Sequence, residues 1–309
     1  MAHTLKTSEA TPALPEPASS QAYMHISALQ AGIIKLPLDL IIQGEPRTYQ
    51  LCPSLSFYLK HSHSERHFIF DLGIRRDWES YPPETKKHYA TLMPCEVPQS
   101  VAESCEKGGI NPADVERVVI SHLHFDHIGD SAPFTKASFI LGGDGKTSLD
   151  DGYPGNPLSH TLASSTPRDR TVFLTAEDFN TSIGPFPHAV DFFGDGSVYI
   201  INTPGHCAGH ITVLARTSAD GAWMYLGGDV AHDRRLITDP AARVGLTAAS
   251  GSPYCMHRDP VQATTDIACV RALVQLPRVE FIIAHDWKFY EESLSLGRAF
   301  LPGRIVPKV

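Results

Sequence analysis

Four side chains of the kinds that bind metals stand within six residues of one another, in the run His122-Leu-His124-Phe-Asp126-His127. An apolar run at 115–121 precedes them and is predicted to be a strand. His122 and His124 are two residues apart, so on extended backbone their side chains point the same way. Asp126 and His127 follow where the chain turns toward a helix, so they can face a second point nearby. Because one tetrahedral ion could not use all four and later ligands as well, the spacing favours two metal ions.

The kind of ligand limits which metals fit. Imidazole nitrogens and carboxylates without cysteine suit zinc, and also iron, manganese or cobalt. We expect two divalent ions, zinc by default, with iron and manganese left open. The chain holds 16 histidines among 309 residues, but an excess alone says little, since many histidines are simply solvated. The alternative interpretation is that Asp126 caps a helix and the histidines lie in the core or on the surface.

Four segments together resemble a known family. The run at 122–127 resembles the His-x-His-x-Asp-His signature of the metallo-beta-lactamase superfamily. Its later ligand segments resemble, in order, Thr203-Pro-Gly-His206, Gly227-Gly228-Asp229 and Ala284-His285-Asp286. The resemblance runs from about Leu55 to Asp286. It implies an α+β fold, an αββα sandwich in which two mixed sheets pack face to face between outer helices.

The resemblance also implies a ligand set and an activity. It places His122, His124 and His206 on the first metal, Asp126, His127 and His285 on the second, and Asp229 as a bridge between them. It implies a metal-dependent hydrolase that opens a small cyclic ester by attack of a metal-bridging hydroxide. Asp126 would hold the hydroxide and later pass its proton to the leaving group.

Three residues near the ligand set are expected to support it rather than to bind metal. Asp71 resembles the acidic residue that supports the metal-binding loops of this superfamily, although a turn-forming aspartate is the alternative. His210 is expected to be a hydrogen-bond partner or a residue of the fold. Cys207, next to His206, is expected to be a small packing residue.

The residues around the signature limit the choice of substrate class. The run at 121–130 looks most like the lactonases that open N-acyl homoserine lactones. Those lactonases carry a tyrosine three residues after the bridging aspartate, and His232 stands there in this chain. A histidine can still donate a hydrogen bond to the substrate, so we expect a catalytic His232, with Tyr153 and Tyr254 as alternative replacements. Fungal members of the superfamily open γ-lactams and benzoxazolinone-type cyclic carbamates, which form the alternative substrate class.

Two other classes of function are weighed against this one. A metal-binding family member without hydrolytic activity is opposed by the complete ligand set. A nuclease is opposed by the formal net charge of −8, because phosphate contacts need clustered lysine and arginine. We therefore expect a small-molecule partner and no nucleic acid. The absence of a long apolar run predicts no membrane partner. Homodimers are common among the resembled lactonases, but the sequence shows no interface.

Short apolar runs and helical patterns alternate along the chain and must position these residues. Strands are predicted at 33–42, 55–59, 67–70, 115–121, 137–141, 197–202, 211–215, 223–227 and 281–284. Helices are predicted at 97–108 and 261–276. The polar stretch at 142–170 lacks periodicity and is predicted to be a long loop near the site. The alternation predicts a sheet-rich core flanked by helices.

Length and composition agree with a globular enzyme. With 309 residues, of which 42% are hydrophobic, the chain can bury a large core. We expect one hydrolase domain over 21–309, preceded by a disordered tail over 1–20 that is rich in Ala, Pro, Ser and Glu. The N-terminus lacks the apolar centre of a secretory signal, so we expect a cytosolic protein with its six cysteines as free thiols.

Overall fold

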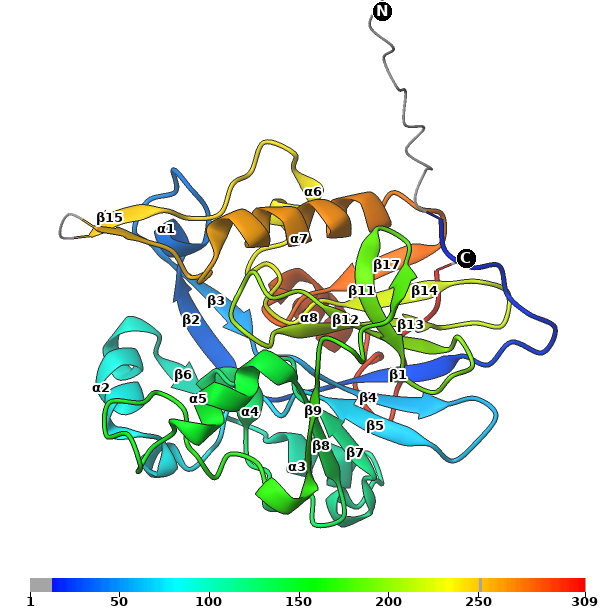
Figure 1. The fold of residues 1–309 in the computed structure, drawn as a ribbon, viewed down its shortest axis with the longest axis horizontal. Coiled ribbons are helices and arrows are strands. Elements are labelled where there is room, and N and C mark those ends of the chain that lie inside the picture. Colours follow the sequence, from blue (N-terminus) through cyan, green and yellow to red (C-terminus); the bar gives the residue numbers. More distant parts are fainter. Residues whose placement is uncertain (1–12, 250–251, 309) are drawn as a thin grey trace, which may run out of the picture.

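Two six-stranded sheets lie face to face in the middle of the structure, a computed structural model that describes residues 13–249 and 252–308 (Figure 1). The first sheet, in spatial order, contains β1 (Met24–Leu29), β4 (Ser56–His61), β5 (His67–Phe70), β7 (Arg117–Val119), β8 (Ser138–Gly142) and β9 (Thr171–Leu174). The second contains β10 (Thr181–Ile183), β11 (Phe186–Asp191), β12 (Val198–Asn202), β13 (Ile211–Arg216), β14 (Trp223–Leu226) and β17 (Val279–Ile282). Each sheet mixes parallel and antiparallel pairs, for example β5 with β7 and β4 with β5.

Central strands of both sheets, such as β4 and β13, are buried on both faces. Successive side chains of a strand point to opposite sides, so each of these strands packs in two layers. In β4, Phe57 packs in the layer between the sheets, whereas Tyr58 packs in the outer layer with Cys105 of α3 (Val101–Lys107). In the second sheet, Leu214 packs in the opposite outer layer with Ile267 of α7 (Pro260–Leu273). Figure 1 shows α7 over one sheet and α3 with α5 (Lys146–Asp150) beyond the other. These layers confirm the predicted αββα sandwich.

Smaller elements surround the sandwich. A three-stranded sheet contains β3 (Tyr49–Pro53), β2 (Ile33–Pro37) and β6 (Cys95–Glu96), and β15 (Thr247–Ala249) pairs with β16 (Ser252–Tyr254). The remaining α-helices are α1 (Leu38–Ile41), α2 (Pro83–Leu92), α4 (Phe125–Ile128), α6 (Arg235–Thr238) and α8 (Trp287–Ser295). Short 3₁₀ turns lie at Trp78–Ser80, Pro112–Asp114, Gly143–Gly145 and Arg168–Arg170. None of the helices in the described chain combines the length and the apolar character needed to cross a bilayer.

Two local predictions differ from the structure. The strand predicted at 33–42 ends at Pro37, and α1 follows, because Pro37 occupies the N-cap and Asp39 stands in the first helical turn. The stretch at 142–170 is not loop throughout, since α5 lies within it. That helix has five residues, which is too short to give a recognisable periodicity.

The two ends of the described chain lie against the sandwich. The C-terminal segment covers the edge of β1, where Leu301 N–H donates to the carbonyl of Ala28 (3.0 Å) and Ile305 N–H to that of Ile26 (2.8 Å). Such cover blocks edge-to-edge pairing with another chain. Residues 1–12 of the predicted tail lie outside the described residues. Within 13–20, the carbonyl of Pro15 accepts a hydrogen bond from Arg216 (2.7 Å).

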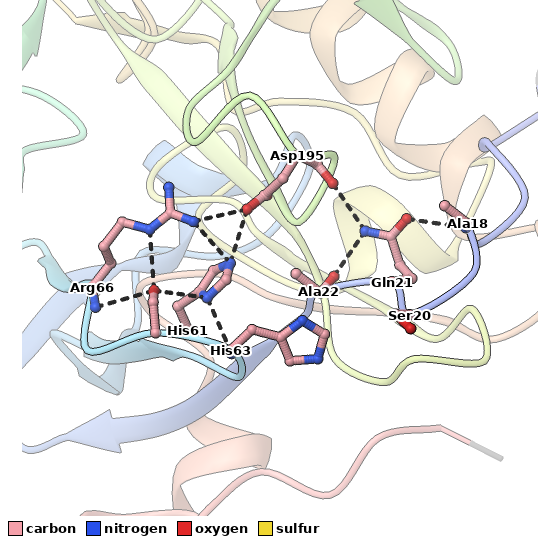
Figure 2. A pocket seen from close by; sticks show the side chains of 9 residues that line it. Ala18, Ser20, Gln21, Ala22, His61, His63, Arg66 and Asp195 are labelled. Atoms are coloured by element: carbon pink, nitrogen blue, oxygen red, sulfur yellow. Dashed lines mark hydrogen bonds and ion pairs between the residues drawn. The ribbon is translucent and has the colours of Figure 1, made fainter.

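A polar cavity of about 300 Å³ lies beside the turn between β4 and β5 (Figure 2). His61 in its wall is buried and contacts Asp195 through Nε2 (2.9 Å) and Ser64 through Nδ1 (2.9 Å). Arg66 also donates to Asp195 (3.0 Å), and Gln21 donates to the Asp195 carbonyl (3.0 Å). These bonds join the N-terminal segment, the β4–β5 turn and the 191–197 loop.

Candidate metal centre

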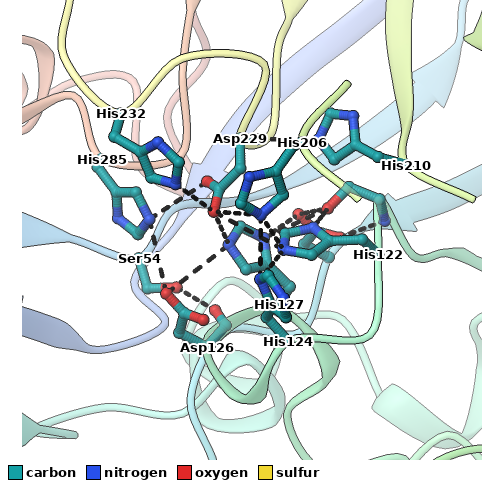
Figure 3. Close-up of polar contacts among 12 residues, drawn as sticks. Ser54, His122, His124, Asp126, His127, His206, His210, Asp229, His232 and His285 are labelled. Atoms are coloured by element: carbon teal, nitrogen blue, oxygen red, sulfur yellow. Dashed lines mark hydrogen bonds and ion pairs between the residues drawn. The ribbon is translucent and has the colours of Figure 1, made fainter. Parts of the chain in front are cut away.

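The strand ends bring together all seven residues predicted as metal ligands (Figure 3). They follow β7, lie on α4, or follow β12, β14 and β17: His122, His124, Asp126, His127, His206, Asp229 and His285. The strands β5 and β7 are parallel, as are β14 and β17, so their carboxyl ends meet at one edge of the sandwich. That edge is where the chain leaves the sheets as loops, which leaves the side chains there free to converge.

Three imidazoles form the first cluster. The Nε2 of His122 lies 2.9 Å from Nδ1 of His124, and Nε2 of His206 lies 3.2 Å and 3.0 Å from the same two nitrogens. Tetrahedral zinc with Zn–N distances of about 2.0–2.1 Å would separate its ligand atoms by about 3.3 Å. The triangle therefore has the size of one face of a zinc coordination sphere.

Burial keeps these three rings neutral, as metal ligands must be. Desolvation lowers the pKa of His122 and His206 well below 6.5 and that of His124 to about 4. A neutral imidazole carries a lone pair on the ring nitrogen that has no proton. Where such nitrogens face one another, their lone pairs repel unless a cation lies between them. The cluster thus fits a bound cation.

Two carboxylates and two imidazoles form the second cluster. The carboxylate of Asp229 lies 3.2 Å from Nε2 of His127 and 3.2 Å from Nε2 of His285, and Asp126 Oδ2 lies 3.5 Å from the latter. Burial alone would raise the pKa of Asp229, but His127 and His285 outweigh it and hold that pKa well below 3.8. Asp229 Oδ2 also lies 3.5 Å from His206 Nε2, so this side chain stands between the two clusters.

Asp71 supports the second cluster from behind. His127 Nδ1 donates to Asp71 Oδ2 (2.8 Å), which leaves Nε2 facing Asp229. The same carboxylate accepts from the backbone N–H (2.6 Å) and the hydroxyl (2.8 Å) of Ser121. Asp71 has a left-handed backbone with φ of 63°, which aspartate tolerates better than most residues. The predicted supporting role of Asp71 matches these contacts.

His210 supports Asp229 in the same way. Its Nε2 accepts a hydrogen bond from the backbone N–H of Asp229 (3.0 Å), so its proton sits on Nδ1, which donates to the carbonyl of Thr203 (3.0 Å). Burial lowers the pKa of His210 to about 3 and keeps this tautomer uncharged. His210 is therefore the hydrogen-bond partner that the sequence predicts.

Residues at the end of β3 and Tyr81 position the remaining residues of the second cluster. His285 Nδ1 donates to the carbonyl of Pro53 (2.9 Å), so its Nε2 is left for the cluster. Ser54 donates from its hydroxyl to the backbone carbonyl of Asp126. Tyr81 donates to the carbonyl of Phe125 (2.6 Å), which fixes the single turn of α4. Both ring tautomer and backbone position are thus set by neighbours outside the cluster.

Cys207 lies near the first cluster, where its sulfur comes within 4.8 Å of the three histidine nitrogens. Burial raises the pKa of its thiol to about 12. Because metals bind the thiolate, a protonated thiol is a poor ligand, and the packing role predicted for Cys207 agrees with this.

His232, the predicted replacement for the lactonase tyrosine, lies beside the centre. It is buried, and its Nε2 is 3.2 Å from Asp229 Oδ2. In the described chain, the rings that contact it belong to His206, His257 and His285. No spacing pattern in the sequence points to His257, which is a single histidine just before the helix start at Asp259-Pro260.

Comparison with known proteins agrees with the geometry. The profile of the Metallo-beta-lactamase superfamily matches residues 49–217. Metallo-hydrolase mfmC of Annulohypoxylon moriforme is 36% identical over 206 residues, 63% of this chain and 54% of that protein. Gamma-lactamase MBL2 of Gibberella moniliformis is 39% identical over 169 residues, 53% of this chain and 70% of that protein.

Solved structures share the fold. An N-acyl homoserine lactone hydrolase, solved with its product N-hexanoyl-L-homoserine at the catalytic metal centre, superimposes with a TM-score of 0.68 at 16% identity. The match covers 92% of this chain and 100% of that one. This chain spans about half the length of mfmC, 54%. Signature, fold and profile agree, and the chain belongs to the metallo-beta-lactamase superfamily.

Proposed function

We propose that the chain is a hydrolase that uses two divalent metal ions to open a small ring at an ester or amide carbonyl. The observation that carries the proposal is the pair of buried clusters that meet at Asp229, one of three neutral imidazoles and one rich in carboxylate. Such a pair suits two cations side by side. When bound, two divalent cations supply an acidic water and polarise a carbonyl oxygen.

The protein side chains have distinct roles in this proposal. His122, His124 and His206 would hold one cation and Asp126, His127 and His285 the other, with Asp229 between the two clusters. Asp126 Oδ2, 3.5 Å from His285 Nε2, takes the proton of the attacking water and passes it to the leaving atom. His232, 3.2 Å from Asp229, donates a hydrogen bond to the substrate oxygen.

A lactone is the first candidate substrate, because the signature resembles that of lactonases. His232 stands where those lactonases carry tyrosine, and this difference favours the second candidate. A γ-lactam or cyclic carbamate is the second candidate. It is supported by the 39% identity to a protein named gamma-lactamase. A lactone releases an oxygen and a γ-lactam releases a nitrogen, whereas the carbonyl carbon of a cyclic carbamate is bonded to both.

A hydrolysis screen tests the proposal. Purified protein would be assayed on acyl homoserine lactones, γ-lactams and benzoxazolinone, with metal content measured on the same sample. We expect about two metal ions per chain and turnover of at least one ring class that a chelator abolishes and added metal restores. Turnover of lactones alone or of amides and carbamates alone would decide between the two candidates. No turnover of any ring with two metals bound would contradict the substrate class.

A further inference from the structure

His257 is a buried imidazole for which the fold provides no partner. It lies between β16 and α7 and is 3% exposed. Neither of its ring nitrogens has a hydrogen-bond partner among the described residues. Buried polar groups in folded proteins are nearly always paired, so an unpaired one next to a reactive centre indicates a ligand that pairs with it.

The backbone that follows His257 directly is bonded to the turn that carries His206. Arg258 N–H donates to the carbonyl of His206 (2.8 Å), and Asp259 N–H donates to that of Gly205 (3.1 Å). Asp259 then caps α7, since its carboxylate accepts from the first backbone N–H groups of that helix. The position of His257 relative to the first metal cluster is therefore set by main-chain bonds.

His257 pairs with His232 at the edge of the candidate metal centre. Their ring centroids are 4.9 Å apart with the planes at 62°. One ring nitrogen from each of His206, His232 and His257 lies within 4.8 Å of the others. His232 Nε2 faces Asp229, while its Nδ1 has no partner among the described residues. Two neighbouring imidazoles thus keep ring nitrogens available beside the reacting atoms.

A third metal ion is the competing occupant of this place. The group consists of histidines alone, so no carboxylate within it would offset another positive charge beside two cations. His206 already directs Nε2 at His122 and His124, and it could serve a third ion only through its other nitrogen. A neutral group with a donor and an acceptor fits the place better.

We propose that His257 and His232 form an imidazole pair that hydrogen-bonds the ring heteroatom and the carbonyl of the substrate. The proposal rests on the function proposed above and extends it to a specificity-determining residue. A neutral imidazole has one donor and one acceptor, so the pair can donate to a ring oxygen and accept from a ring N–H. His257 is then a substrate-contacting residue.

The test compares metal-loaded wild type with His257→Phe, His257→Gln and the matched control His188→Phe, which changes an exposed histidine of β11. The probes are N-hexanoyl homoserine lactone and benzoxazolinone. We expect His257→Phe to keep the wild-type metal content and lose about 10- to 100-fold in kcat/KM, as for the loss of a buried hydrogen bond. His257→Gln, which still donates and accepts, recovers part of the loss, and His188→Phe matches wild type.

Each contrary result has a separate meaning. If His257→Phe or His257→Gln loses a metal ion, His257 binds metal and the proposal is wrong. If both variants keep the wild-type kcat/KM on rings that the wild type opens, the imidazole pair is wrong while the proposed function stands. If metal-loaded wild type opens no ring, the proposed function is wrong. The wild-type activity is therefore measured before any variant is compared. His257→Gln alone decides the result if His257→Phe does not fold.

Discussion

At three buried histidines, a neighbouring group holds one ring nitrogen and thereby decides which nitrogen is left. His127 donates to Asp71, His285 donates to the Pro53 carbonyl, and His210 donates to the Thr203 carbonyl. A flipped imidazole ring would direct a carbon atom at a cation, and the other tautomer would direct an N–H group at it. The candidate metal centre therefore depends on residues that would never touch a metal ion.

Asp71→Asn is expected to lower metal affinity by about 10- to 100-fold. The asparagine tolerates the left-handed backbone at this position, where φ is 63°, so the main chain is not strained. Its amide group, however, can place a donor against His127 Nδ1 and move the ring proton to Nε2. Competition with a chromophoric chelator measures the change. Asp169→Asn, on an exposed aspartate, is the matched control. Equal affinities for Asp71→Asn and wild type would contradict the supporting role.

Between elements, the Gly205 turn lies directly against the first turn of α7. A Cβ added at Gly205 would lie 2.2 Å from the backbone nitrogen of Ala263. The Gly205 N–H donates to the Asp266 carboxylate of the same helix (2.9 Å). The helix therefore fixes the turn that carries His206, and glycine is required there by proximity.

Gly205→Ala is expected to destabilise the fold by about 1–3 kcal/mol and to reduce metal content, because the α7 backbone must move away from the turn. Urea unfolding and metal analysis of the same sample measure both effects. Gly145→Ala serves as control, since its added Cβ would find its nearest neighbour, Leu123 Cδ1, at an ordinary 3.7 Å. If the two variants were equally stable, the α7 contact would not determine the geometry of the turn.

For the whole molecule, removal of metal is expected to lower stability. The centre lies where both sheets end, and its members come from segments throughout the sandwich. Ions that bind the folded state alone stabilise it by about 2.7 kcal/mol at a free concentration 100 times Kd. Thermal unfolding should shift downward in chelator and return on addition of zinc or manganese. An unchanged midpoint would mean that the clusters bind no metal with useful affinity.

Acid is expected to weaken the contacts around the polar cavity. Burial alone would raise the pKa of Asp195, but hydrogen bonds from Ser197 and His61 outweigh it and hold that pKa below 3.8. A carboxylate whose pKa is lowered by folding contributes its full stabilisation when the pH is above its pKa in the unfolded chain. This stabilisation is lost as the pH falls below about 4.

Asp195→Asn should therefore lower the free energy of unfolding by about 1 kcal/mol at neutral pH, since partial exposure weakens hydrogen bonds to a charge. The difference from wild type should shrink below about pH 4, where the wild-type carboxylate is itself protonated. Urea unfolding between pH 3 and 7 measures it, with exposed Asp169→Asn as control. A difference that is the same at every pH would contradict the charged role of Asp195.

Local features of the fold follow from short stretches of sequence. The strand at 67–70 is predicted with its observed bounds. The helix predicted at 97–108 contains α3, which begins directly after its N-cap Ser100, and Ser100 forms a capping box with Glu103. The spacing in the run at 122–127 predicts side chains that face a common place, because the direction of a side chain along a strand end is fixed over a few residues. The resemblance to the superfamily adds the three later segments to the predicted ligand set. The end of β2 at Pro37 and the start of α1 show where such prediction fails, since a short apolar run suits a strand and a helix equally.

Contacts between residues far apart in the sequence arise from the packing of the whole fold. His206 contacts His122 across 84 residues of sequence, and Asp229 stands between the clusters because β14 ends at the same edge as β7. No sequence spacing relates His257 to the ligand segments. Its place beside His232 results from the main-chain hydrogen bonds between the start of α7 and the Gly205 turn. Such contacts depend on how the sheets and helices pack, and packing is a property of all segments together rather than of any one sequence window.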